Sequence, residues 1–129
     1  MLDTNIVSDL IRNPYGRPAA RLVEHGVAGI CLSIVTACEL RFGAACSRSA
    51  RLRDRIDEML SSLDVLPLDA PADREYGALR AELRAAGRPI GPNDLFIAAH
   101  ARALQVTLVT HNTREFGRVR GLKLDDWLA

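Results

Sequence analysis

The chain of 129 residues is 48% hydrophobic, so it can bury the core of one domain without disulfide bonds or a structural metal. Its 17 basic and 16 acidic side chains leave a formal charge of +1, which excludes a uniformly basic surface that would bind any polyanion. The three cysteines contain no Cys-x-x-Cys pair, which argues against a zinc site or a disulfide framework and indicates small core residues in a reducing compartment.

Short apolar segments alternate with amphipathic helical patterns along the chain. The patterns predict strands at 1–3, 29–33, 65–68, 106–110 and 122–124. They predict helices at 6–11, 19–24, 34–45, 48–63, 72–86 and 93–103. The first strand is then very short, unless the natural start lies a few residues upstream. Strands that alternate with helices are typical of a parallel sheet covered on both faces, so we predict an α/β fold, a three-layer α/β/α sandwich with a central, mostly parallel sheet.

We expect a single domain over residues 1–129, because no repeat, low-complexity tract or long linker interrupts the chain. Asp3 stands where a signal peptide needs positive charge, and the apolar stretch at 27–40 is too short to cross a bilayer. We therefore expect a cytoplasmic protein that does not bind a membrane.

Three acidic residues fall at or just after predicted strand ends, where open parallel sheets form their sites. Asp3 ends the first strand, Glu39 lies on the helix after the second, and Asp94 lies in the first turn of the helix after Gly91-Pro92. Asp3 could instead only cap the helix that follows it, and Asp94 could only complement the positive end of a helix. Glu39 projects from a largely apolar helical face, so an unpaired charge there needs a cation or an arginine partner.

The fourth candidate position follows the predicted strand at 106–110. Asn112 or Glu115 could complete an acidic cluster, although Asn112 could equally be a turn or helix-capping residue. Several carboxylates can converge with little repulsion only if a cation lies between them, and oxygen ligands favour Mg²⁺ or Mn²⁺. Such an ion can activate water against a phosphate, so the sequence predicts phosphodiester hydrolysis.

Five segments in order carry a family resemblance: MLDTNIV at 1–7, SIVTACEL at 33–40, GRPIGPND at 87–94, VTHNTREF at 109–116 and a tail from Gly121 to Trp127. With these segments, which cover nearly the whole chain, the sequence resembles the PIN-domain family, especially VapC-like toxins. The resemblance implies a Mg²⁺- or Mn²⁺-dependent endoribonuclease whose catalytic metal ligands are Asp3, Glu39 and Asp94. Many relatives carry an acid at the position of Asn112 or of Glu115. Because Asn112 is an amide, the resemblance implies that Glu115 is the acid of this motif. It also implies that Thr4, Asn5 and Thr110 are supporting polar residues near the metal rather than ligands.

The same resemblance implies the toxin of a type II toxin-antitoxin pair, which inhibits translation by cutting tRNA or another structured RNA. The expected partners are the RNA substrate, a VapB-type antitoxin and further copies of the chain in a homodimer or higher oligomer. Operator DNA would be reached only through the antitoxin. The basic candidates for RNA contact, each equally well explained as a solvated surface charge, are Arg12, Arg17, Arg41, Arg88, Arg114 and Arg118.

Other mechanisms are weighed against this one. A metal-independent ribonuclease would need a histidine base, for which His111 is nearer the predicted site than His25 or His100. A dehalogenase-like phosphatase needs a second acid where Asn5 stands, and a phosphoacceptor domain needs paired acids that are missing. The non-enzymatic alternative is a protein-interaction module that acts with a DNA-binding antitoxin and has no nuclease activity of its own.

Overall fold

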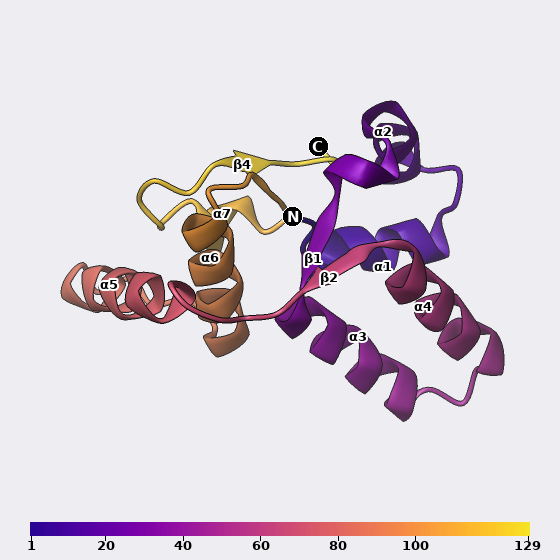
Figure 1. The fold of residues 1–129 in the computed structure, drawn as a ribbon, viewed down its shortest axis with the longest axis horizontal. Coiled ribbons are helices and arrows are strands. Elements are labelled where there is room, and N and C mark those ends of the chain that lie inside the picture. The colour runs from indigo at the N-terminus through magenta and orange to yellow at the C-terminus, as the bar shows by residue number, and fades with distance from the viewer.

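The computed structural model describes residues 1–129, and its centre is a parallel sheet of very short strands. β1 (Cys31–Ser33) pairs in parallel with β2 (Asp64–Leu66), and β3 (Leu108–Val109) pairs in parallel with β4 (Leu124–Asp125). Residues 1–3 join the two pairs, because the Leu2 amide donates to the Cys31 carbonyl at 3.0 Å and Leu2 forms a parallel bridge with Val109. The N-terminus therefore lies at the centre of the molecule (Figure 1).

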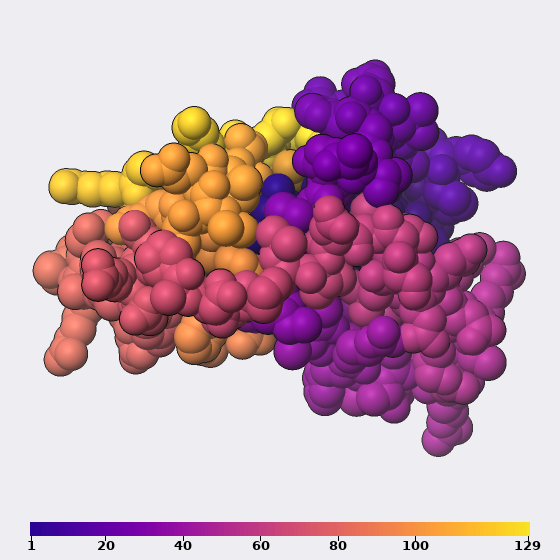
Figure 2. All heavy atoms as spheres, viewed as in Figure 1, coloured from indigo at the N-terminus to yellow at the C-terminus, as the bar shows by residue number.

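Helices cover both faces of this sheet. They are α1 (Thr4–Arg12), α2 (Arg17–His25), α3 (Ile34–Cys46), α4 (Ala50–Ser62), α5 (Ala72–Ala85), α6 (Pro92–Leu104) and α7 (Thr113–Phe116), with a 3₁₀ turn η1 (Val27–Gly29). Helices α1 to α4 lie on one side of the molecule and α5 to α7 on the other, and the chain after β2 crosses between the two sides (Figures 1 and 2).

Side chains of the central strands alternate between two separate hydrophobic cores. Leu2 and Val109 pack in the core that contains residues of α1, α3 and α4, whereas Met1 and Leu108 pack in the core that contains residues of α5, α6 and α7. Successive side chains of a strand point to opposite faces, so a sheet with a core on each face needs helices on both. The predicted α/β/α sandwich is confirmed.

The predicted helices are confirmed, with ends that differ by a few residues, and most of the strands are shorter than predicted. The segment predicted as a strand at 106–110 pairs only at Leu108–Val109, and the last strand begins at Leu124 rather than Leu122. The four-residue helix α7 was not predicted, because a single helical turn has no periodicity to detect. None of the helices combines the length and the apolar composition that a membrane span requires.

The expectation that the cysteines are core residues is wrong for two of them. All three are free thiols, but Cys38 and Cys46 are exposed and Cys31 is half-buried. Helix α3 buries the stripe formed by Thr36, Ala37, Leu40 and Ala44, and Cys38 and Cys46 fall outside it.

Candidate active site

Asp3 is both a helix cap and a member of an acidic cluster. Its Oδ1 accepts a hydrogen bond from the Thr4 amide at 2.8 Å, so the capping interpretation is confirmed. Its Oδ2 accepts a hydrogen bond from Thr110 Oγ at 2.8 Å, and the residue is only 4% exposed. Burial and the charge of Glu39 raise the pKa of Asp3, against the hydrogen bonds from Thr110 and Thr4 that lower it. Asp3 therefore caps α1 and at the same time lies close to the acid Glu39.

Glu39 reaches the same cluster from α3. Its Oε1 accepts a hydrogen bond from Thr4 Oγ at 2.6 Å, which links it to the first turn of α1. No arginine forms an ion pair with Glu39. The ion pairs of the protein all involve other acids: Arg21 with Asp125, Arg41 with Asp57, Arg102 with Glu75 and Glu82, and His111 with Asp126. The arginine alternative for Glu39 is therefore wrong.

Asp94 lies in the first turn of α6, which begins at Pro92. Burial raises the pKa of Asp94 to about 7, together with its hydrogen bond to Glu115 and the charges of Asp3, Glu115 and Glu39. Acids from α7, α3 and the first strand segment thus act on one carboxyl group of α6. Neighbouring carboxylates therefore add to the effect of burial on the pKa of Asp94.

Asn112 joins the last two acidic positions. Its Nδ2 donates to Glu115 Oε2 at 2.9 Å and to Asp94 Oδ2 at 3.3 Å. It stands at the N-cap position of α7, but its side chain does not cap that helix. Hydrogen bonds from Asn112 and Asp94 lower the pKa of Glu115. Both residues that were candidates for the fourth position therefore lie at the cluster, one as a hydrogen-bond donor and one as the acid.

The three supporting polar residues hold this arrangement together. The Thr4 hydroxyl donates a hydrogen bond to Glu39. The buried Thr110 hydroxyl donates to Asp3 and accepts a hydrogen bond from the backbone N–H of Asn112 at 3.0 Å. Asn5 Nδ2 approaches Asp3 Oδ2 at 3.4 Å, and Asn5 Oδ1 accepts from the His111 amide at 3.2 Å. The acids are positioned by neutral donors, none of which cancels their charge.

The donor set fits a hard divalent cation. The carboxyl groups of Asp3, Glu39, Asp94 and Glu115 offer only oxygen atoms as ligands, and none of them forms an ion pair with a basic side chain. The pKa of Asp94 is raised, so its carboxyl group binds a proton more readily than usual. No three His, Cys, Asp or Glu side chains are close enough to enclose an ion as they stand. An ion held here would therefore keep water among its ligands, as Mg²⁺ commonly does.

The histidines have different surroundings. His100 is buried with Nδ1 2.8 Å from Ser33 Oγ, and His25 stacks on Trp127 with ring centroids 5.4 Å apart, so both are structural. His111 is exposed, its Nδ1 lies 2.9 Å from Asp126 Oδ2, and it adjoins the cluster through Asn5. It is the one histidine that adjoins the acidic cluster.

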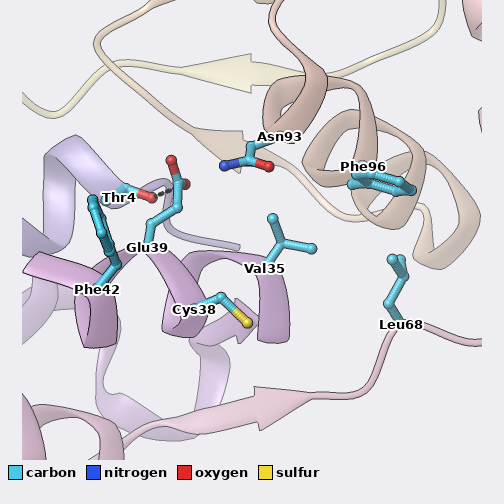
Figure 3. A pocket seen from close by; sticks show the side chains of 8 residues that line it. All are labelled: Thr4, Val35, Cys38, Glu39, Phe42, Leu68, Asn93 and Phe96. Carbon is cyan, nitrogen blue, oxygen red and sulfur yellow. Dashed lines mark hydrogen bonds between the residues drawn. The ribbon is translucent and has the colours of Figure 1, made fainter. Parts of the chain in front are cut away.

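Two hollows flank Glu39. The larger, called here the Glu39 groove, has a volume of about 700 Å³ and is lined by Thr4, Val35, Cys38, Glu39, Phe42, Leu68, Asn93 and Phe96 (Figure 3). The smaller, of about 260 Å³, also contains Thr4 and Glu39 and includes Arg12. The sequence interpretation missed Phe42, Asn93 and Phe96, although Phe42 follows Glu39 by three residues and the other two flank Asp94.

Among the basic candidates, several have structural partners. Arg17 donates to the Ala129 carbonyl, Arg41 pairs with Asp57, and Arg118 donates to the Pro89 carbonyl. Arg12 is the candidate that lines a hollow next to Glu39.

Comparison with known proteins agrees with this fold. The PIN domain family model matches residues 1–122. The chain is 44% identical to the tRNA(fMet)-specific endonuclease VapC of Shigella flexneri, with 98% of this chain and 96% of that protein covered. It is 38% identical to the Ribonuclease VapC2 of Haemophilus influenzae, with 99% and 97% covered. The structure is similar to VapBC2 of Rickettsia felis bound to a DNA fragment from its promoter, with a TM-score of 0.91, 35% identity and 98% and 97% of the chains covered. DNA-bound VapBC of Salmonella typhimurium gives a TM-score of 0.92 at 37% identity, with 98% and 96% covered.

Proposed function

The chain belongs to the PIN-domain family, and from this premise we propose that it is a VapC-type toxin, an endoribonuclease that cuts RNA with a divalent metal held by its acidic cluster. The observation that carries the metal dependence is that no ion pair neutralises Asp3, Glu39 or Asp94, although the charges of Asp3 and Glu39 reach Asp94 and add to the burial that raises its pKa to about 7. A cation between them removes this repulsion.

The roles of the residues follow from their contacts. Asp3, Glu39 and Asp94 would hold Mg²⁺ or Mn²⁺, with Asp3 and Glu39 oriented by hydroxyl donors. The ion would supply an activated water and neutralise charge on the phosphate. Hydrogen bonds from Asn112 and Asp94 lower the pKa of Glu115, so this residue would supply a lasting negative charge at the edge of the cluster.

The partners are proposed from the relatives. The named specificity of the Shigella relative supports tRNA as the substrate class. The similarity to DNA-bound VapBC complexes supports a VapB-type antitoxin and an oligomeric assembly. We further propose that this chain contacts operator DNA only through the antitoxin. No observation favours the alternative of an interaction module without nuclease activity.

Cleavage of total cellular RNA by the purified chain tests the proposal. Discrete new 5′ ends are expected with Mn²⁺ or Mg²⁺, and none with excess chelator or in Asp3→Ala. Because Asp3 also caps α1, Asp94→Asn provides a second inactive variant, and Glu24→Gln, at an exposed position on α2, is the active control. Cleavage that survives chelation, or full activity in Asp94→Asn, would show that the metal assignment is wrong.

A further inference from the structure

The Glu39 groove is continuous with the acidic cluster. Glu39 and Thr4 form its wall at one end and are joined by their hydrogen bond of 2.6 Å. The rest of the groove extends between α3 and the start of α6 (Figure 3). A chain whose phosphate lies at the cluster must therefore place a neighbouring group in or beside this groove.

The walls of the groove suit a neutral aromatic group. Phe42 is 72% exposed and Phe96 is 37% exposed, and both line it with Val35 and Leu68. None of the residues that line the groove is an arginine or a lysine, so a phosphate there would have no cation, whereas Arg12 lines the hollow on the other side of Glu39. Charge therefore favours the RNA backbone on the Arg12 side and an uncharged group in the groove.

The Phe96 wall is held in place before any ligand binds. The Phe96 ring stacks on Tyr76 with centroids 4.7 Å apart and an angle of 17° between the planes. Phe42 lies three residues after Glu39, on the same side of α3. Between them Asn93 points its amide toward the groove (Figure 3), which offers a donor and an acceptor to the edge of a base.

We propose that the Glu39 groove binds one unstacked nucleobase next to the scissile phosphate, with Phe42, beside Glu39, as the stacking surface and Asn93 at the base edge. This inference rests on the proposed ribonuclease function. Every base has a π face, so stacking gives affinity without strict sequence preference. A base in the groove must leave its helix, which makes an unpaired stretch of RNA the substrate at the cut.

The test combines a protein variant with an altered RNA. The substrate is a single-stranded oligonucleotide that contains a site cut by the wild type, prepared intact and with an abasic nucleotide on either side of the cut. Phe42→Ala is expected to lower kcat/KM on the intact RNA about tenfold, mainly through KM. Phe42→Tyr should restore most of this loss. Val23→Ala, at an 84% exposed position on α2 outside the groove, is the matched control.

The abasic RNA shows whether the ring acts through a base. One abasic position should lower the wild-type rate by a similar factor, and combining it with Phe42→Ala should cause no further loss, because both changes remove the same contact. Losses that multiply would show that Phe42 acts elsewhere, and the inference would be wrong.

Cys38 provides a readout that does not depend on cleavage. Its thiol is exposed in the groove, whereas Cys46 is exposed at the end of α3. Saturating oligonucleotide, bound to the non-cleaving Asp94→Asn variant with Mn²⁺, should slow alkylation of Cys38 by N-ethylmaleimide relative to Cys46. The inference would be wrong if Cys38 were alkylated at the same rate with and without RNA and Phe42→Ala had the kcat/KM of the wild type. An apolar protein segment would then be the occupant that the groove fits. If wild type cuts no RNA, the proposed function itself fails.

Discussion

Thr4 Oγ donates a hydrogen bond of 2.6 Å to Glu39 Oε1, so the first turn of α1 orients an acid that lies 35 residues later on α3. Hydrogen bonds to charged groups are stronger than neutral ones and shorten accordingly. The bond gives Glu39 one defined position beside Asp3, whose capping interaction starts the same helix.

Replacing this hydroxyl tests how far orientation matters. Thr4→Val keeps the shape of the side chain and removes the donor, so we expect kcat to fall about tenfold, equivalent to about 1.4 kcal/mol, because Glu39 loses its fixed orientation. Thr4→Ser keeps the donor and should retain most of the activity. Single-turnover cleavage at saturating Mn²⁺ measures both. Equal rates for Val and Ser would show that the hydroxyl has no role in positioning.

Asp94→Asn should stabilise the metal-free protein while it abolishes cleavage. The pKa of Asp94 is raised from 3.8 to about 7, so the folded carboxyl binds its proton more tightly than the unfolded one. Its stabilising contribution is present below about pH 4 and is lost as the pH rises toward 7. In chelator at pH 8, Asn should therefore raise the free energy of unfolding by about 1 kcal/mol, discounted for solvent screening. Urea unfolding at pH 8 and pH 3.5 measures this, and an equal gain at both would contradict it.

Asn112→Asp should make folding depend more strongly on the metal. The change removes the donor that serves Glu115 and Asp94 and adds a negative charge beside both. We expect a lower Tm in chelator and a larger rise in Tm on adding Mn²⁺ than in the wild type. Thermal unfolding with and without Mn²⁺ tests this. A Tm in chelator equal to that of the wild type would contradict the expected repulsion.

Acidification should destabilise the fold through His100. Burial lowers the pKa of His100, so the unfolded chain takes up a proton before the folded one does. The stabilising contribution is present above about pH 6.5 and is lost as the pH falls below it. His100→Gln removes the titrating group, so it should flatten the decline between pH 7 and pH 5, although it also disturbs the contact with Ser33. If the free energy of unfolding fell equally in the wild type and in His100→Gln between pH 7 and pH 5, groups other than His100 would cause the loss of stability.

Local features of the sequence were sufficient for much of this description. Capping by Asp3 and the helical periodicities involve residues within a few positions of one another, so they can be recognised without coordinates. The order of strand and helix patterns was enough to predict parallel pairing and helices on both faces. The strings around Asp3, Glu39 and Asp94 predicted which acids should meet.

Tertiary packing decided the rest. The two-residue strands form because neighbouring strands supply their hydrogen-bond partners, which no local preference encodes. The contact of Asn112 with Asp94, the lack of an arginine partner for Glu39 and the groove between Phe42 and Phe96 depend on how α3, α6 and α7 pack. Sequence patterns report interactions between near neighbours, whereas the distance between residues tens of positions apart is set by the cooperative burial of the whole core.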